Sequence, residues 1–501
     1  MVKHFCISLG LLAAASLPLQ AGQTPDAAAA PREISIGIRA DQLQREVPKR
    51  FLGLAIEKEQ LNSGEFARAN SSLSRLLENL GEGTLRVGGE SADYTAFAPV
   101  KADLPPGCRI KRTLAPAAIE EMFHFVQQVR WQVIYALNLG CYSPGPMAQE
   151  AQYVYSVSHG SLLAFEVGNE PDMFPLQGYR AASYDSSSFL EQYEAYRAAL
   201  RRAIPEAGLS GPGVGYYQNG VTWLPRFLAA ESQGLAFTSA HFYPMVRPDG
   251  LPKGVPPIPE SSPVFPTIAH MLNPRVPQLV MENAFVPQMR ASEAQKLPFR
   301  ITEINSAAHG GKTGVSDVFA SALWLLDYSF RFLALGADGI DVTTDLPHGA
   351  VYSAIQVENG VHVARPIYYG MLVFHEAAQG RTVPVELAGE TSDLNFSAYS
   401  TAGPDRAARV TLINKDPTLT VRARIRIAGD RYGSAKVLRL SAPSLEAQSG
   451  IEFGGAAVRP DGSWQLKSGE AIQEDSGAFA VSVPPGSAAL LIAEPRAPTH
   501  R

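Results

Sequence analysis

Short apolar runs that alternate with helical patterns constrain this chain more than any other feature of its sequence. Eight runs between residues 51 and 342 have the length and composition of strands buried on both faces. They are 51–56, 84–87, 132–137, 162–167, 208–214, 236–242, 299–302 and 339–342. Helical patterns lie between them: over 71–80, for example, Leu73, Leu76, Leu77 and Leu80 recur at intervals of three and four residues. Eight strand–helix units predict an α/β fold in which residues 49–380 close into a (β/α)8 TIM barrel.

The pattern changes after residue 380. Six short strand-like runs follow without a long helix, at 382–387, 394–399, 408–413, 421–427, 435–441 and 487–492. Turn residues separate them, as in an antiparallel β-sandwich, which we expect over 381–497. An alternating run before the barrel places Ile34, Ile36 and Ile38 on one face. We expect segment 33–48 to add this strand to the sandwich, so that both ends of the chain form the second all-β domain.

The N-terminus resembles an export signal. Lys3 and His4 precede an apolar stretch over 5–17, and Leu19-Gln20-Ala21 is a plausible cleavage site. We therefore expect a signal peptide over 1–21, an Ala- and Pro-rich linker over 22–32, and a secreted or periplasmic protein. No later stretch reaches the roughly 18 apolar residues of a membrane span. A net charge of -5 and a pI near 6.1 give no basic footprint for nucleic acid.

The cysteines and histidines indicate no metal site. Cys6 lies in the expected signal peptide, and the sequence leaves open whether Cys108 and Cys141 form a disulfide or two free thiols. No Cys/His spacing has the form of a zinc site, and no P-loop or GxSxG motif is present. We expect neither a metal nor another cofactor; the oligomeric state is not predicted.

Two glutamates indicate the chemistry. Glu170 follows the fourth predicted strand and Glu303 ends the seventh, at the barrel edge where TIM-barrel enzymes place their catalytic residues. One protonated and one ionised carboxyl group suffice to cleave a glycosidic bond, and a separation of about 5–5.5 Å is typical of retention. Asn169 lies beside Glu170, where its amide can bind a sugar hydroxyl. The pattern predicts a glycosidase that acts on a carbohydrate.

Six stretches, in order, resemble glycoside hydrolase family 79, the β-glucuronidase and heparanase family of clan A retaining glycosidases. They are FLGLAIE at 51–57, LRVGGESADY at 85–94, FEVGNEPD at 165–172, HFYP at 241–244, ITEINSAAHGG at 301–311 and HGAVYSA at 348–354. The resemblance implies that Glu170 is the acid/base and Glu303 the nucleophile. It further implies substrate contacts from Glu57, Gly88, Gly89, Glu90, Asn169, Tyr243, His309, Gly310, Gly311, Gly349 and Tyr352. Of these, Tyr243 would bond the nucleophile, and the segments around Gly310, Gly311 and Gly349–Tyr352 would bind the uronate carboxylate. His309 stands where exo-acting bacterial members tend to have an aromatic residue.

The resemblance predicts a retaining exo-β-D-glucuronidase that releases terminal β-linked glucuronic acid from glycoconjugates or oligosaccharides. One alternative is an endo-acting, heparanase-like enzyme on heparan sulfate, which would need Lys and Arg along an open cleft for the sulfates. Another is a glycosidase of the same clan with a neutral substrate. The alternative of a different class is a non-catalytic carbohydrate-binding protein, against which the presence of both Glu170 and Glu303 speaks.

Overall fold

The computed structural model describes residues 30–67, 71–102, 104–105, 108–251, 256–389, 391, 393–429, 432–467 and 469–496, without the side chains of 277 and 278. The expected signal peptide and residues 22–29 of the expected linker lie outside the described residues. In the part that is described, no helix is long and apolar enough to cross a membrane.

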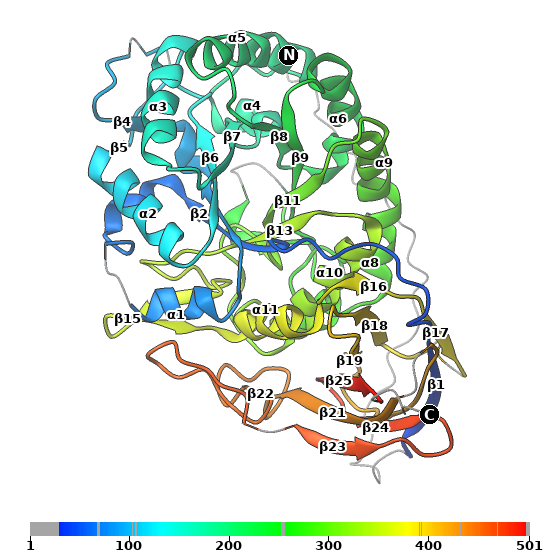
Figure 1. The fold of residues 1–501 in the computed structure, drawn as a ribbon. Coiled ribbons are helices and arrows are strands. Elements are labelled where there is room, and N and C mark those ends of the chain that lie inside the picture. Colours follow the sequence, from blue (N-terminus) through cyan, green and yellow to red (C-terminus); the bar gives the residue numbers. More distant parts are fainter. Residues whose placement is uncertain are drawn as a thin grey trace, which may run out of the picture.

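A closed barrel of eight parallel strands forms the larger part of the fold (Figure 1). Around the barrel, the strands follow the order β11-β13-β2-β3-β6-β7-β8-β9. Their bounds are β2 (Leu52–Glu57), β3 (Thr84–Gly88), β6 (Gln132–Leu137), β7 (Leu162–Val167), β8 (Leu209–Val214), β9 (Leu235–Phe242), β11 (Phe299–Ile304) and β13 (Gly339–Thr343). Each corresponds to one of the eight predicted strands, and the predicted fold class is confirmed. Even β8, with Gly211, Pro212 and Gly213, keeps its place between β7 and β9.

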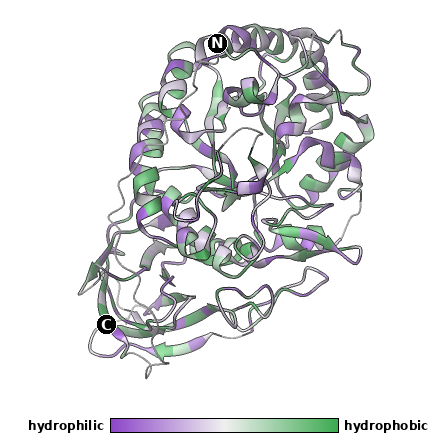
Figure 2. Ribbon diagram, turned by 180° about the vertical axis from the view of Figure 1, so that it is seen from behind, coloured by the Kyte–Doolittle hydropathy of each residue, from purple (hydrophilic) through white to green (hydrophobic). Residues whose placement is uncertain are grey.

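Helices surround the barrel, and hydrophilic and hydrophobic residues are interspersed along them (Figure 2). The longer ones are α2 (Pro116–Gln128), α3 (Pro144–Val157), α5 (Ser186–Ala203), α6 (Tyr217–Glu231), α10 (Ala320–Leu335) and α11 (Pro366–Ala377), with the shorter α1 (Ser72–Glu78) and α9 (Val286–Ala294). Helix α10 begins at Ala320, and residues 313–317 before it form turns. Helix α6 was not predicted, since Gly220 and Pro225 interrupt its pattern, although Leu224, Phe227 and Leu228 are buried as on any amphipathic helix.

The second domain contains two β-sheets. One sheet has the order β17-β1-β20-β24, and the other has the order β16-β18-β19-β25-β21-β22, with β23 also paired to β21. The bounds are β1 (Arg32–Ile38), β16 (Arg381–Thr382), β17 (Val385–Ala388), β18 (Phe396–Ala402), β19 (Ala408–Asn414), β20 (Val421–Ile427), β21 (Tyr432–Ser441), β22 (Glu452–Phe453), β23 (Glu470–Gln473), β24 (Phe479–Val483) and β25 (Ser487–Pro495). Strand β1 joins this domain as predicted, but it runs parallel to β20, so the sandwich is not wholly antiparallel.

A buried ion pair joins the two domains. Lys415, which follows β19, places its ammonium group 2.6 Å from Asp327 Oδ2 on α10, and both side chains are almost fully buried. Tyr399 on β18 donates its hydroxyl to the other oxygen of Asp327 at 2.7 Å, and Arg331 on α10 lies 3.0 Å from Oδ2. The Asp327 carboxylate is thus bound by Arg331 of barrel helix α10 and by Lys415 and Tyr399 of the small domain.

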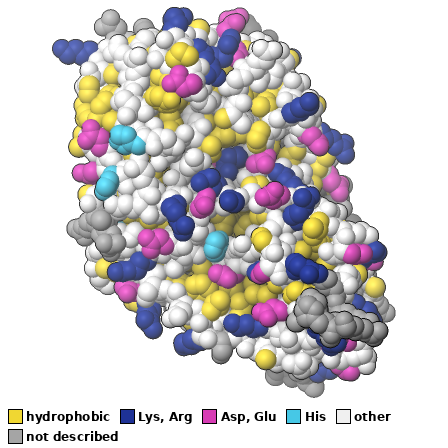
Figure 3. All heavy atoms as spheres, viewed as in Figure 1, with side chains coloured by type: hydrophobic (Ala, Val, Ile, Leu, Met, Phe, Trp, Pro, Cys, Tyr) yellow, Lys and Arg dark blue, Asp and Glu magenta, His cyan; other side chains and the backbone are white. Residues whose placement is uncertain are grey.

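A disulfide links Cys108 and Cys141, the pairing that the sequence left open. It connects the segment between β4 (Thr95–Phe97) and β5 (Arg112–Leu114) with the segment after β6, across 33 residues of chain. Charged side chains elsewhere are mixed: on the face drawn in Figure 3, Lys and Arg are interspersed with Asp and Glu.

Candidate active site

The two predicted catalytic glutamates lie close together at the carboxyl end of the barrel. Glu303 is in β11, and Glu170 lies three residues after β7, in the left-handed conformation at φ 50°. One carboxylate oxygen of each lies within 4.8 Å of the other. His241, at the end of β9, lies between them, with Nδ1 at 2.8 Å from Glu170 Oε1 and 3.8 Å from Glu303 Oε2. The structure therefore brings two carboxyl groups and an imidazole into one site.

Cationic and hydroxyl donors surround Glu303. Arg86 on β3 donates Nη1 to Glu303 Oε1, and Tyr243 donates its hydroxyl to Oε2 at 2.8 Å. Burial raises the pKa of Glu303, but His241, Arg86 and the hydrogen bond from Tyr243 together outweigh it and hold that pKa below the usual range of a glutamate. Glu303 is thus kept ionised, as a nucleophile must be.

The environment of Glu170 has the opposite effect. Burial raises its pKa, against the hydrogen bond and charge of His241, and the negative charges of Glu303 and Asp172 raise it further. Gly215, after β8, lies so close that a Cβ there would be 2.6 Å from the Glu170 carboxyl carbon. Two neighbouring carboxyl groups with pKa values shifted in opposite directions are suited to acid and nucleophile roles.

Arg86 also fixes the residues next to the two glutamates. Its Nε and Nη2 donate to Glu166 on β7 at 2.9 and 2.7 Å, and Nη2 donates to Asn169 Oδ1 at 2.8 Å. Because Oδ1 of Asn169 accepts from Arg86, its Nδ2 group is directed to donate elsewhere. Asp93 accepts from the backbone N–H of Asn169 at 2.9 Å, and burial raises the pKa of Asp93 to about 6.

The predicted contacts after β2 and β3 form a second wall of the site. Glu57 accepts hydrogen bonds from the backbone N–H of Ser91 at 2.8 Å and from its hydroxyl. Burial raises the pKa of Glu57 to about 8, with a further contribution from the charge of Glu303. Gly89 has φ 68°, and a Cβ there would lie 2.2 Å from the Glu57 carboxyl carbon. Gly88 is buried at the end of β3, whereas Glu90 is exposed.

The predicted uronate loops lie beside Tyr243. Tyr352 stacks on Tyr243 with ring centroids 6.4 Å apart, and its backbone N–H donates to the Gly310 carbonyl at 3.3 Å. Gly310 and Gly311 adopt positive φ, and a Cβ at Gly311 would lie 2.9 Å from that of Tyr352. Gly349 donates its N–H to the Asp345 carbonyl at 3.2 Å, so this N–H already has a protein partner. His309 is exposed at φ 62°, and its Cβ would lie 2.6 Å from a Cβ at Gly250.

His241, Arg86, Glu166 and Asp93 were not among the predicted site residues. A signal for His241 was present, because it precedes Tyr243 by two residues, and side chains two apart on a strand point to the same face. Glu166 and Asp93 lie in two of the family-like stretches, but the sequence does not show their partners, which are far along the chain.

Among the described residues, one group of His and acidic side chains has atoms close enough to ligate a metal ion. It consists of Glu170, His241 and Glu303. The guanidinium of Arg86 bonds one of the three, Glu303, and its positive charge opposes a cation there. The arrangement suits an organic substrate better than a metal.

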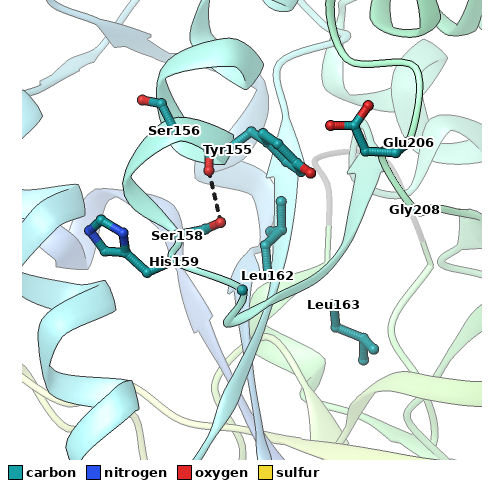
Figure 4. Close-up of a pocket in the computed structure, with 9 residues that line it drawn as sticks. Tyr155, Ser156, Ser158, His159, Leu162, Leu163, Glu206 and Gly208 are labelled. Carbon is teal, nitrogen blue, oxygen red and sulfur yellow. Dashed lines mark hydrogen bonds between the residues drawn. The ribbon is translucent and has the colours of Figure 1, made fainter.

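A cavity of about 560 Å³ lies elsewhere (Figure 4). It is lined by Tyr155, His159, Leu162 and Glu206, where α3 ends and β7 begins. Parallel strands place their beginnings and ends at opposite edges of the barrel, so this cavity is at the other end from Glu170 and Glu303.

The amino-acid sequence of this chain is similar to those of known proteins. The glycosyl hydrolase family 79 C-terminal beta domain matches residues 397–490. A β-glucuronidase of Aspergillus niger is 23% identical over 498 residues, covering 86% of this chain and 87% of that protein. One of Neurospora crassa is 23% identical over 317 residues, covering 55% and 53%.

Solved structures share the fold. A 4-O-α-L-rhamnosyl-β-D-glucuronidase from Fusarium oxysporum has a TM-score of 0.73 at 17% identity, covering 91% of this chain and 99% of that one. A family 51 arabinofuranosidase from Xanthomonas axonopodis pv. citri has a TM-score of 0.67 at 15% identity, covering 92% and 100%. The combination of barrel and β-domain is thus similar in enzymes with different sugar substrates.

Proposed function

We propose that this chain, which belongs to glycosyl hydrolase family 79, is a retaining β-glucuronidase. The observation that carries the proposal is that one carboxylate oxygen of Glu170 lies within 4.8 Å of one carboxylate oxygen of Glu303. Inverting glycosidases need about 6.5–9.5 Å between their carboxyl groups, whereas retaining enzymes have about 5–5.5 Å. The similarity to the fungal β-glucuronidases supports glucuronic acid as the sugar.

The reaction follows from the different surroundings of the Glu303 and Glu170 carboxyl groups. Glu303, held ionised by Arg86 and Tyr243, attacks the anomeric carbon while Glu170 protonates the leaving oxygen. The resulting glucuronosyl ester on Glu303 is hydrolysed by a water molecule that Glu170, now ionised, deprotonates. Asn169 donates its Nδ2 group to a sugar hydroxyl beside the reacting carbon.

Exo action on an unsulfated terminal glucuronate is favoured over endo action on a sulfated polymer. Three cations near the site already have protein partners: Arg86 bonds Glu166 and Glu303, Arg247 lies 3.0 Å from Asp249, and Lys312 donates to the Pro266 carbonyl at 3.1 Å. The Tyr352 hydroxyl and the backbone of Gly310 and Gly311 are suited to bind the uronate carboxylate. The signal-like N-terminus supports a secreted or periplasmic location for this reaction.

Comparison of an aryl β-D-glucuronide with the matching glucoside tests the substrate. We expect wild-type enzyme to prefer the glucuronide. In Tyr352→Phe, kcat/KM for the glucuronide should fall about tenfold or more, because a hydrogen bond to a charged group is worth about 1.5–3 kcal/mol. The glucoside lacks the carboxylate and should be affected less. A wild-type preference for the glucoside would refute glucuronidase action and leave only the barrel glycosidase assignment.

The pH profile tests the roles of the two glutamates. Activity requires ionised Glu303 and protonated Glu170, so kcat/KM should rise with pH through the lowered pKa of Glu303 and fall through the raised pKa of Glu170. A bell-shaped profile should result, with its acidic limb below the usual range of a glutamate. In Glu170→Ala, assayed with an aryl glucuronide that has a good leaving group, the alkaline limb should vanish. Its persistence would assign that limb to another group.

A further inference from the structure

Two large apolar side chains in the segments that follow β7 and β8 are exposed. Leu176, on the short helix α4 (Phe174–Gln177), is 63% exposed, and Tyr216, which immediately precedes α6, is 48% exposed. Their loops follow β7 and β8, which are neighbours in the barrel. Exposed apolar surface next to catalytic residues is available to contact a ligand.

The backbone under Tyr216 is firmly held. Asp172, two residues after Glu170, accepts the N–H groups of Gly215 at 2.8 Å and Tyr216 at 3.0 Å, and the side-chain amide of Asn219 at 2.9 Å. The next residue, Tyr217, packs against Phe242 and Phe285 with ring centroids 5.6 and 5.9 Å apart. One tyrosine of the pair therefore anchors the loop in the core, and the other presents its ring to solvent.

Tyr216 lies on the Glu170 side of the site. Its neighbour Gly215 is in contact distance of the Glu170 carboxyl group. Burial raises the pKa of Tyr216, and the charges of Asp172 and Glu170 raise it further. Most of the contacts proposed for the glucuronosyl unit come from the end of β2 and the segments after β3, β11 and β13, with Asn169 after β7 and Tyr243 after β9. Since Glu170 protonates the leaving oxygen, groups beside it contact the leaving group.

We propose that Tyr216 is the platform for the leaving group, and that the preferred aglycone therefore has a flat apolar face, as an aryl ring or a sugar ring has. The proposal rests on the proposed function, because it requires Glu170 to act on a glucuronoside. An aromatic ring offers such a face at low conformational cost, and both ring types can stack on it.

The test compares Tyr216→Ala and Tyr216→Phe with wild type on phenyl β-D-glucuronide, methyl β-D-glucuronide and a β-glucuronosyl disaccharide. We expect Tyr216→Ala to lose about tenfold in kcat/KM for the phenyl substrate, since aromatic contacts are of this order. The methyl substrate, which has no ring to stack, should be unaffected, and Tyr216→Phe should behave as wild type. Inhibition by free glucuronic acid should not change, because the product has no aglycone.

Tyr155→Ala is the matched control. Tyr155 lines the cavity drawn in Figure 4, at the opposite end of the barrel, and is 37% exposed. It should leave all three substrates unaffected. A loss in Tyr216→Ala for phenyl and disaccharide substrates alike supports a platform for either ring, and a loss for the phenyl substrate alone supports an aryl aglycone. An equal loss for methyl and phenyl substrates, or weaker inhibition by glucuronic acid, would overturn the proposal in favour of a structural role. So would an unchanged phenyl rate. If wild type hydrolysed no glucuronide, the proposed function itself would fail first.

Discussion

Glu303→Ala should lose at least about 10⁴-fold in kcat on an aryl β-glucuronide, because removal of a catalytic nucleophile costs several orders of magnitude. Without the carboxylate no covalent intermediate forms, while Glu170 and His241 remain in place. Added azide should restore turnover by entering the space left by the side chain. Azide then attacks the face that Glu303 attacked, so the product should be the α-glucuronosyl azide.

Glu170→Ala is the informative counterpart. This variant keeps the nucleophile and still forms the covalent intermediate from substrates with good leaving groups, so azide should give the β-glucuronosyl azide. Opposite anomers from the two variants would fix both roles in one experiment. Wild-type activity in Glu303→Ala, with its fold confirmed by an unchanged unfolding midpoint, would refute the assignment. Measurable sugar binding without any wild-type hydrolysis would point to a carbohydrate-binding protein instead.

Lys415→Met should destabilise the protein by about 3–5 kcal/mol, the usual effect of breaking a buried ion pair. The substitution leaves the Asp327 carboxylate buried with Arg331 and Tyr399 as partners but without its contact to the ammonium group. Urea unfolding followed by circular dichroism measures the change, and loss of the pair should lower the midpoint of the small domain first.

Lys467→Met serves as the control, since Lys467 is an exposed lysine of the same domain. It should change stability by less than about 0.5 kcal/mol. The double variant Asp327→Leu/Lys415→Met removes the buried carboxylate with the ammonium group and should recover part of the loss, while Arg331 loses its carboxylate partner. Equal stability of Lys415→Met and Lys467→Met would show that the domain contact does not depend on this pair.

The barrel was predictable because its strands are separate short runs of strand-like sequence, and helical patterns follow most of them. The same logic located Glu170 and Glu303, since parallel strands place their ends at one edge. Helix α6 was not predicted because Gly220 and Pro225, which disfavour helices, interrupt its apolar pattern. The parallel partner of β1 could not be predicted either, because strand periodicity reveals which face is buried but not the direction of the neighbouring strand.

Much of the site depends on contacts that no local pattern contains. Arg86 joins Glu166, Asn169 and Glu303, which are 80, 83 and 217 residues away along the chain. Glu57 accepts its hydrogen bonds from Ser91, a partner that the sequence around Glu57 does not indicate. The backbone N–H of Gly349 is already used in a turn, where it donates to the Asp345 carbonyl. A sequence motif identifies the glycine but not the hydrogen bond that its N–H makes.

The position of β1 has a consequence for how the chain assembles. Strand β1 lies between β17 and β20, about 350–390 residues further along the chain, so the barrel is covalently an insertion within the smaller domain. During synthesis the first strand has no sheet to join until the last quarter of the chain has emerged. Contacts so distant in sequence form slowly. The barrel can therefore close before the small domain is complete, and a nascent chain carries an unpaired, apolar β1 throughout that interval.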